Sequence, residues 1–180
     1  RRWLGEPPPS AATINRVLAV ARGDVRAAEL PGGDRVERAG GRLTRITGSP
    51  SPVPASVPLR LPGRARFGRW DIAAWIEHDA PAVWPDGRAV AVCDADAVGD
   101  DVAVRAAAAG ERLRPLGATG SKLVRDALAE GGIPAGVRDH APIVVADGPI
   151  WLVGYRIDHR VRVTARTRRY LWLSAEPVSQ

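Results

Sequence analysis

A proline-rich segment divides this chain of 180 residues. It contains five prolines between positions 48 and 62: Pro50, Pro52, Pro54, Pro58 and Pro62. Each proline fixes φ and removes a backbone donor, so the segment cannot be the middle of a helix or of a central strand. We therefore expect residues 49–62 to be a linker or an edge segment between two parts of the chain.

Residues 1–48 carry the pattern of a helix followed by a hairpin. Four apolar side chains recur at the spacing i, i+3, i+4, i+7: Ile14, Val17, Leu18 and Ala21. This spacing predicts one apolar helix face, and Ser10 before it and Gly23 after it are typical helix-capping residues. Residues 35–38 and 43–46 flank a Gly-Gly pair, which predicts a β-hairpin.

The remainder consists mostly of strand patterns. Residues 63–103 are predicted to be a connecting β segment, with strands at 70–77, 89–93 and 102–105. Residues 104–175 are predicted to be a C-terminal domain. Its main helix spans 121–130, and its strands lie at 143–145, 150–153, around 161–163 and at 170–173. The predicted class is α+β: a small helix-plus-hairpin part, then a mixed or antiparallel β-rich domain with one main helix.

Charge and composition narrow the choice of partner. The net charge is +6 and the sequence pI about 10.8, which favours an acidic partner, most often nucleic acid. An arginine-rich, lysine-poor composition also fits a GC-rich genome, so the charge has a second explanation. The single cysteine, Cys93, suits a reducing cytoplasm, and no apolar run approaches the ~20 residues that span a bilayer. Because methionine is absent, we expect the chain to be a piece of a longer protein.

Lys122 is the only lysine. It follows Gly120-Ser121, and Ser121 is expected to cap the helix at 121–130. The first N–H groups of a helix are unpaired and its dipole end is positive, so a lysine there is best explained by an arriving anion. With basic residues on both sides, that anion would be a nucleic-acid phosphate. The alternative is a solvated lysine without a role.

The sequence lacks a catalytic or metal-binding pattern. The Gly-Ser-Lys order does not match a Walker A loop, which requires Gly-Lys-Ser/Thr after a strand. The loop at 31–34 is best interpreted as a turn. Three histidines, His78, His140 and His159, have no metal-ligand spacing with Cys93 or one another. The six tryptophans could stack on bases, but most lie in apolar strand patterns and are expected in the core.

One stretch resembles a known family. Residues 104–173 are similar to the C-terminal domain of tRNA(Ile)-lysidine synthases, which carries Gly-Asp/Glu-Arg-Phe-x-Pro-Leu-Gly, then Gly-Ser-Lys-Lys, Arg-Asp-x-x-Pro and Gly-x-Arg-Ile. The matching positions are Gly110, Glu111, Arg112, Pro115, Leu116, Gly117, Gly120, Ser121, Lys122, Asp126, Ile133, Pro134, Arg138, Asp139, Pro142, Gly154, Arg156 and Ile157. Residues 11–47 resemble the end of that family's central substrate-binding region. Leu123 replaces the second lysine of the motif, which removes one cation. Leu113 replaces the phenylalanine of the motif.

The resemblance implies a role in tRNA recognition. The family joins lysine to the wobble cytidine of the isoleucine tRNA with a CAU anticodon, using ATP. Its ATP-binding catalytic half precedes these domains, so ATP and Mg²⁺ are expected there and no cofactor in this chain. The implied partners are that tRNA and the catalytic domain of the same protein. The residues expected to contact tRNA are Arg112, Arg114, Lys122, Arg125 and Arg138. The sequence does not determine the oligomeric state, nor whether this chain by itself is an enzyme.

A structural role is the competing hypothesis. In that case the C-terminal domain packs on the catalytic half without touching RNA, and Arg138-Asp139 and Arg156-Ile157-Asp158 form internal ion pairs. The two hypotheses differ in where the cations lie. RNA binding requires Arg112, Arg114, Lys122 and Arg125 on one exposed face, whereas scattered or carboxylate-paired cations favour the structural role.

Overall fold

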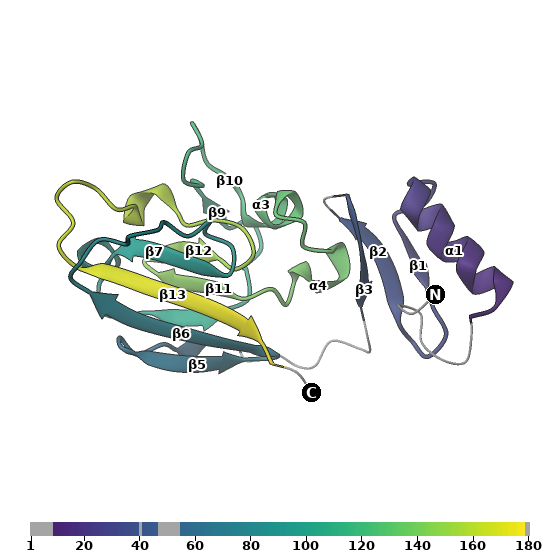
Figure 1. Ribbon diagram of the computed structural model, residues 1–180, viewed down its shortest axis with the longest axis horizontal. Helices are drawn as coiled ribbons and strands as arrows, with labels where there is room; N and C mark the ends of the chain where they lie inside the picture. The colour runs from purple at the N-terminus through teal and green to yellow at the C-terminus, as the bar shows by residue number, and fades with distance from the viewer. Residues whose placement is uncertain (1–8, 40, 47–54, 179–180) are drawn as a thin grey trace.

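The computed structural model describes residues 9–39, 41–46 and 55–178. Two units are visible: a helix beside a small sheet, and a larger β-rich body (Figure 1). Trp3 and much of the predicted proline-rich linker lie outside the described residues. In the part of the chain that the structure describes, no helix is long and apolar enough to cross a membrane.

The first unit begins with α1 (Ala11–Arg22). The Ser10 hydroxyl accepts the Thr13 N–H at 3.2 Å, which satisfies one of the unpaired donors of the first turn. Gly23 ends the helix with φ at 90°, a left-handed conformation that glycine adopts without strain. The predicted helix and both of its caps are confirmed, but its buried side chains are Thr13 and Val20, whereas Leu18 of the predicted apolar face is exposed.

A three-stranded antiparallel sheet packs against α1. Its order is β1 (Ala27–Glu29), β2 (Arg35–Ala39) and β3 (Arg42–Ile46). The pairing of β2 with β3 confirms the predicted hairpin, whereas β1 was not predicted. Val20 of α1, Leu30 and Val36 form a small core between helix and sheet.

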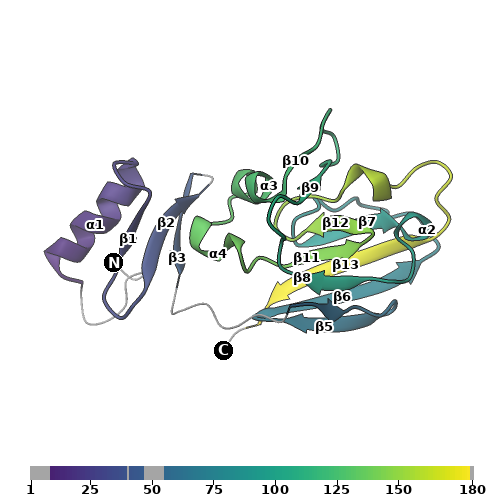
Figure 2. The ribbon, with the colours of Figure 1, turned by 180° about the vertical axis from the view of Figure 1, so that it is seen from behind.

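One sheet of the larger body contains strands from both the beginning and the end of residues 63–177. It contains β5 (Gly63–Phe67), β6 (Trp70–Glu77), β13 (Tyr170–Pro177) and β7 (Val90–Asp94), in the order β5-β6-β13-β7. The C-terminal strand β13 thus lies between β6 and β7 and is antiparallel to both (Figure 2). Segment 63–103, expected to connect two parts, therefore shares its sheet with the end of the chain.

A second sheet packs over the first. Its order is β12 (Gly148–Leu152), β11 (Ile143–Ala146), β8 (Ala103–Arg105) and β4 (Val57–Pro58). Buried side chains from both sheets share one core; the fully buried Phe67 and Leu171 come from the first sheet, and Val144 and Trp151 from the second. Burial of large apolar side chains is the main stabilising contribution to such a body.

Short elements lie around the two sheets. They are α2 (Ala95–Val98), β9 (Arg112–Leu113), β10 (Lys122–Leu123), α3 (Val124–Glu130), α4 (Ala135–Arg138) and the 3-10 helix η2 (His159–Val161). A second core under α3 contains Leu113, Val124, Leu128 and Ile143. Few helices and antiparallel sheets confirm the predicted α+β class.

Two predicted elements differ from the structure. The helix expected from Ser121 begins at Val124, because Lys122–Leu123 pairs with β9 and the Val124 N–H donates to the Glu111 carbonyl at 2.8 Å. The strand expected around 161–163 is partly replaced by η2, which Asp158 caps by accepting the Arg160 N–H.

The two units touch through β2 and α4. The Gly136 N–H donates to Glu37 Oε2 at 3.3 Å, and Glu37 Oε1 lies 3.0 Å from Arg35 Nε. The Glu37 side chain is only 5% exposed. A charge so far removed from water requires its partners, so this contact helps to fix the first unit against the second.

Candidate nucleic-acid interface

A single extended segment presents basic side chains to solvent. Residues 112–116 alternate strictly: Arg112, Arg114 and Leu116 are exposed, whereas Leu113 and Pro115 are buried. Alternate residues of an extended chain share a face and lie about 6.5 Å apart. We call Arg112, Arg114 and Leu116 the outward row.

The outward row is fixed from behind by the segment at 157–159. The buried carboxylate of Asp158 accepts the Arg114 N–H at 2.8 Å. The His159 N–H donates to the Arg114 carbonyl at 2.7 Å, and the Leu116 N–H to the Ile157 carbonyl at 3.0 Å. The backbone that carries Arg114 is therefore held on both sides, while its side chain is exposed.

Neighbouring groups leave the two arginines of the row without an acidic partner. Arg112 donates from Nε to the Ser121 hydroxyl at 3.1 Å and from Nη2 to the Ser121 carbonyl at 2.9 Å. Both acceptors are neutral, so its charge is not cancelled. Within the described residues, Arg114 forms no salt bridge.

Beneath Arg112, a salt bridge stabilises the start of β9. Arg105 donates to Glu111 Oε1 at 2.5 Å and to Oε2 at 2.9 Å, and the Ala108 N–H also donates to Oε2. Burial alone would raise the pKa of Glu111, but the hydrogen bonds from Arg105 and Ala108 lower it below its ordinary value. Glu111 is thus occupied by Arg105 and does not neutralise the row.

At the Arg112 end of the row lies a groove of about 430 Å³ between the 107–111 segment and α3–α4. We call it the helix groove. Its lining includes Leu123, Arg125 and Arg138, and Leu123 is the residue directly opposite Arg112 in the ladder. Opposed residues of an antiparallel pair point to the same face, so the helix groove adjoins the row.

The two arginines of the helix groove also lack acidic partners. Arg138 donates to the Ile133 carbonyl at 2.7 Å, and the Arg138–Asp139 ion pair considered from the sequence is not formed among the described residues. Arg125 is exposed, and in the same part of the chain it has no salt bridge. Four of the five predicted contact residues therefore have no acidic partner in the described part of the chain.

Lys122 differs from the other four. It pairs with Leu113 in the ladder, and so faces away from Arg112. Its ammonium donates to both oxygens of Glu130 at 2.7 Å, and Tyr155 donates its hydroxyl to the same carboxylate at 2.8 Å. The hydrogen bond with Glu130 raises the pKa of Lys122. The prediction that Lys122 occupies a helix start is wrong, because that residue is in a strand.

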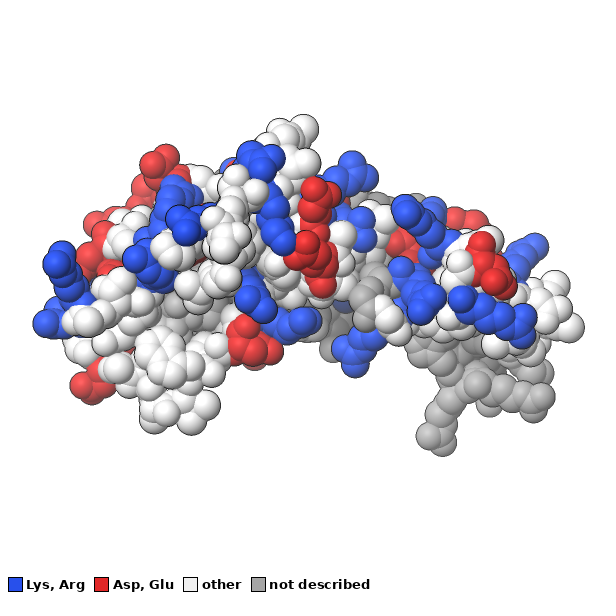
Figure 3. Space-filling view, turned by 90° about the horizontal axis from the view of Figure 1, so that it is seen from above, with Lys and Arg blue, Asp and Glu red and all other residues white. Residues whose placement is uncertain are grey.

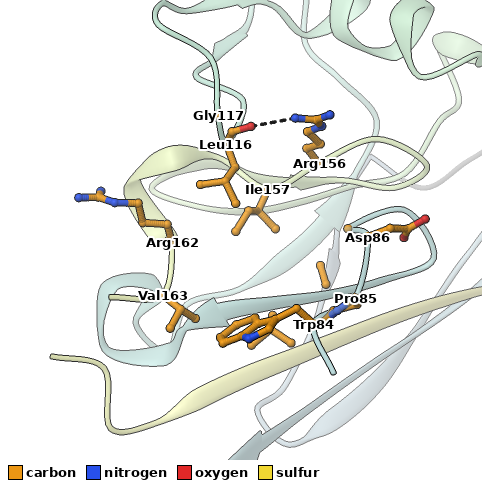
Figure 4. Close-up of a pocket in the computed structure, with 12 residues that line it drawn as sticks. Trp84, Pro85, Asp86, Leu116, Gly117, Arg156, Ile157, Arg162 and Val163 are labelled. Atoms are coloured by element: carbon orange, nitrogen blue, oxygen red, sulfur yellow. Dashed lines mark hydrogen bonds between the residues drawn. The ribbon is translucent and has the colours of Figure 1, made fainter. Parts of the chain in front are cut away.

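A second groove, of about 530 Å³, lies at the Leu116 end of the row. We call it the tryptophan groove. Trp84, Leu116, Arg156 and Arg162 line it together with Ile157 and Val163 (Figure 4). Arg156 donates to the Leu116 carbonyl at 3.1 Å. The Arg156–Asp158 pair considered from the sequence is not formed in the described chain, where Asp158 pairs with Arg160 instead.

A further arginine, Arg162, adds positive charge to the tryptophan groove. Arg162 lies beside His159, with Nη1 3.2 Å from Nδ1 of the ring. Burial, followed by the charges of Arg162 and Arg114, lowers the pKa of His159 below its ordinary value. Figure 3 views the side on which β9 and β10 lie; basic side chains are spread over this side of both units, with acidic side chains between them.

The chemistry of this surface is that of anion binding. No group of three or more His, Cys, Asp or Glu that could hold a metal ion occurs among the described residues. Cys93 is buried, and burial followed by the charge of Asp94 raises its pKa to about 12. Guanidinium groups held on a fixed backbone suit the planar recognition of phosphate oxygens.

Comparisons with known proteins agree with the motif. Residues 102–172 match the family model of the TilS substrate C-terminal domain. The tRNA(Ile)-lysidine synthase of Symbiobacterium thermophilum is 30% identical over 174 residues, which cover 89% of this chain and 36% of that protein. The enzyme of the same name from Dehalococcoides mccartyi is 37% identical over 83 residues, 46% of this chain and 18% of its own length. The chain resembles the C-terminal part of tRNA(Ile)-lysidine synthases.

A solved structure supports the fold of the second unit. The chain described as the crystal structure of the TILS C-terminal domain superposes with a TM-score of 0.62 at 23% identity, covering 69% of this chain and 98% of that one. The present chain spans about a third or less of the length of the tRNA(Ile)-lysidine synthases that it matches.

Several residues shared with tRNA(Ile)-lysidine synthases have structural roles here. Gly154 has φ at 86°, and a Cβ at this position would lie 2.9 Å from Ile133 Cδ1, so a larger residue would both strain the backbone and displace Ile133. Pro115 forms a β-bridge with Asp158. The family motif therefore holds the outward row in place and supplies Arg112, whereas Arg114 stands at a variable position of the motif.

The sequence did not predict the tryptophan groove. From the sequence, Trp84 is one of six tryptophans, Arg156 is a motif position and, in the structural hypothesis, an ion-pair partner, and Arg162 has no assigned role. These side chains come from segments 84–87, 116–117 and 156–163, which only the fold brings together. The available signal was Trp84 itself, which lies between Val83 and Pro85 and outside any alternating strand pattern.

Proposed function

We propose that this chain binds and positions tRNA for a tRNA(Ile)-lysidine synthase. The observation that carries the proposal is the outward row, in which Arg112 and Arg114 lie on one exposed face with no acidic partner in the described structure. Arg125 and Arg138 extend this cationic surface into the helix groove. Phosphate contacts from such side chains supply most of the affinity for nucleic acid and fix its register.

We propose that the bound tRNA is the isoleucine tRNA with a CAU anticodon, because the matched relatives carry the name tRNA(Ile)-lysidine synthase. The reaction proposed for the complete protein joins lysine to the wobble cytidine of that tRNA with ATP. ATP and Mg²⁺ belong in this proposal to the catalytic domain, with which this chain would pack in the cytoplasm. The role of the present residues is to bind and orient RNA, and no chemical step is assigned to them.

In this proposal Lys122 is a phosphate contact whose ammonium is occupied by Glu130 in the unbound chain. Its ammonium is held by Glu130 and can meet a phosphate only by exchanging that carboxylate. The same ion pair is the observation that favours the alternative function, a structural module that packs on the catalytic domain without touching RNA. The exposed, uncompensated Arg112 and Arg114 are difficult to reconcile with the alternative, because a packing surface normally pairs its charges.

The test is binding of the whole chain to the CAU-anticodon isoleucine tRNA across a salt series, with elongator methionine tRNA as competitor. The proposal predicts binding that weakens steeply with salt, since each neutralised phosphate releases a counterion, and a preference for the isoleucine tRNA. Absence of binding at low salt would contradict the proposal and support the structural module.

A further inference from the structure

The tryptophan groove has an unusual combination of exposed groups. Trp84 is 56% exposed and Leu116 39% exposed, whereas Phe67, Trp151 and Leu171 of the sheets are fully buried. An exposed indole in a hollow is uncommon on a well-packed domain, and exposed aromatic surface beside cations is typical of binding sites. The groove also adjoins the outward row, since Leu116 belongs to both.

The two walls of the groove face each other. Leu116 and Ile157 point toward the loop that carries Trp84, and Arg162 extends outward at the end of the groove (Figure 4). A volume of about 530 Å³ lies within the range of ligand sites. A flat ring inserted here would meet apolar side chains on one side and an indole on the other.

The charged side chains around the tryptophan groove indicate which kind of flat ring would bind there. Arg156 and Arg162 line the groove, and His159 and Arg114 lie just beyond Arg162. The one lining carboxylate, Asp86, accepts the Arg88 N–H at 2.9 Å and closes its own turn. The surroundings are therefore cationic, which suits a ring attached to phosphate and disfavours a cationic or purely apolar ligand.

We propose that the tryptophan groove captures an unpaired nucleotide of the RNA bound along the outward row, with its base stacked on Trp84 and its phosphate near Arg162. The inference rests on the proposed function and adds a site for single-stranded RNA to it. Bases that are not stacked in a helix bind proteins by aromatic stacking combined with arginine contacts.

The test compares two RNA probes that differ only in unpaired nucleotides. One is a blunt RNA stem, and the other is the same stem with a four-nucleotide 3′ overhang. The groove predicts that the overhang improves binding by about 5- to 150-fold, the range for stacking of one base on an aromatic side chain. Trp84→Ala should remove this advantage and leave binding of the blunt stem unchanged, and Trp84→Phe should retain most of it.

Matched controls isolate the groove. Val83 is 81% exposed and adjacent in sequence but does not line the groove, so Val83→Ala should leave the overhang advantage intact. Arg162→Ala should reduce the advantage, whereas Arg166→Ala, an exposed arginine outside the groove, should not. Because Trp84 is exposed, all variants are expected to keep the thermal midpoint of the unaltered chain, which is measured alongside.

The outcomes separate the two proposals. If the blunt stem binds but the overhang adds nothing, or Trp84→Ala weakens both probes equally, the groove is not a nucleotide site and the proposed function stands. If neither probe binds at low salt, both proposals are wrong and the groove belongs to a protein contact.

Discussion

The Asp158 carboxylate accepts the backbone N–H of Arg114 at 2.8 Å, across 44 residues of sequence. Its other oxygen accepts the Arg160 N–H at 2.8 Å and Arg160 Nε at 3.1 Å. One buried acidic group therefore ties the outward row to the segment that lines the tryptophan groove. The arginine that is expected to meet phosphate is positioned by a carboxylate that RNA does not reach.

Replacement of Asp158 should destabilise the body and weaken RNA binding. Asp158→Ala leaves the Arg114 N–H, the Arg160 N–H and Arg160 Nε without their shared acceptor, at a cost of about 2–4 kcal/mol in the free energy of unfolding. Urea denaturation measures this cost. Asp96→Ala removes a carboxylate that pairs with Arg169 at the surface and should change stability by less than about 1 kcal/mol. Equal effects of both variants would mean that Asp158 is not a structural anchor.

Lys122 should contribute less to RNA binding than the outward row. Because Glu130 competes for its ammonium, Lys122→Ala should change the slope of log K against log salt by less than Arg112→Ala does. Glu130→Gln, which releases Lys122, should increase the slope by up to about one unit, the value for one added phosphate contact. A Lys122→Ala variant that loses a full unit would show that RNA displaces Glu130 completely.

The Arg105–Glu111 salt bridge should make stability depend on pH at the acidic end. The pKa of Glu111 is lowered in the folded chain, so the folded state binds this proton less readily than the unfolded state. The contribution is present above the ordinary carboxyl pKa and is lost as the pH falls through the lowered value. Thermal unfolding from pH 7 to pH 3 should show a smaller acid loss for Glu111→Gln than for the unaltered chain. Identical curves would contradict the assignment.

Cys93 should be chemically inert in the folded chain. Its thiol is buried and its pKa is raised to about 12, so almost no thiolate exists at pH 8. Reaction with an aromatic disulfide reagent should be negligible without denaturant and rapid in urea. The unfolding midpoint followed by this reaction should coincide with the midpoint from circular dichroism. Fast labelling of the folded chain would show that the strand carrying Cys93 opens locally.

Local patterns predicted the elements whose determinants are local. The helix α1 was predictable because Ser10 and Gly23 cap an apolar stripe, and the hairpin at 35–46 because alternating residues flank glycines. Placement of β13 between β6 and β7 was not predictable, because that pairing joins residues 76 to 107 positions apart in sequence.

The types of residue in the candidate site were predictable from the sequence, but their arrangement in space was not. Arg112 and Arg114 share one exposed face, and Arg125 and Arg138 line the helix groove; of these four, only Arg112 and Arg138 are positions of the family motif. Lys122 was misplaced because its helix-start signals were outweighed by pairing with β9, a tertiary contact that residue propensity does not register. The tryptophan groove was missed because segments distant in sequence form it.

The most direct test of the central claim is the salt dependence of tRNA binding by the double variant Arg112→Ala/Arg114→Ala. Its control is Arg60→Ala/Arg69→Ala, which removes the same charge from exposed positions near β5 and β6. We predict that the double variant in the row lowers the salt slope by about two units and that the control leaves the slope nearly unchanged. Equal slopes for the two double variants would show that net charge, and not the outward row, holds the RNA.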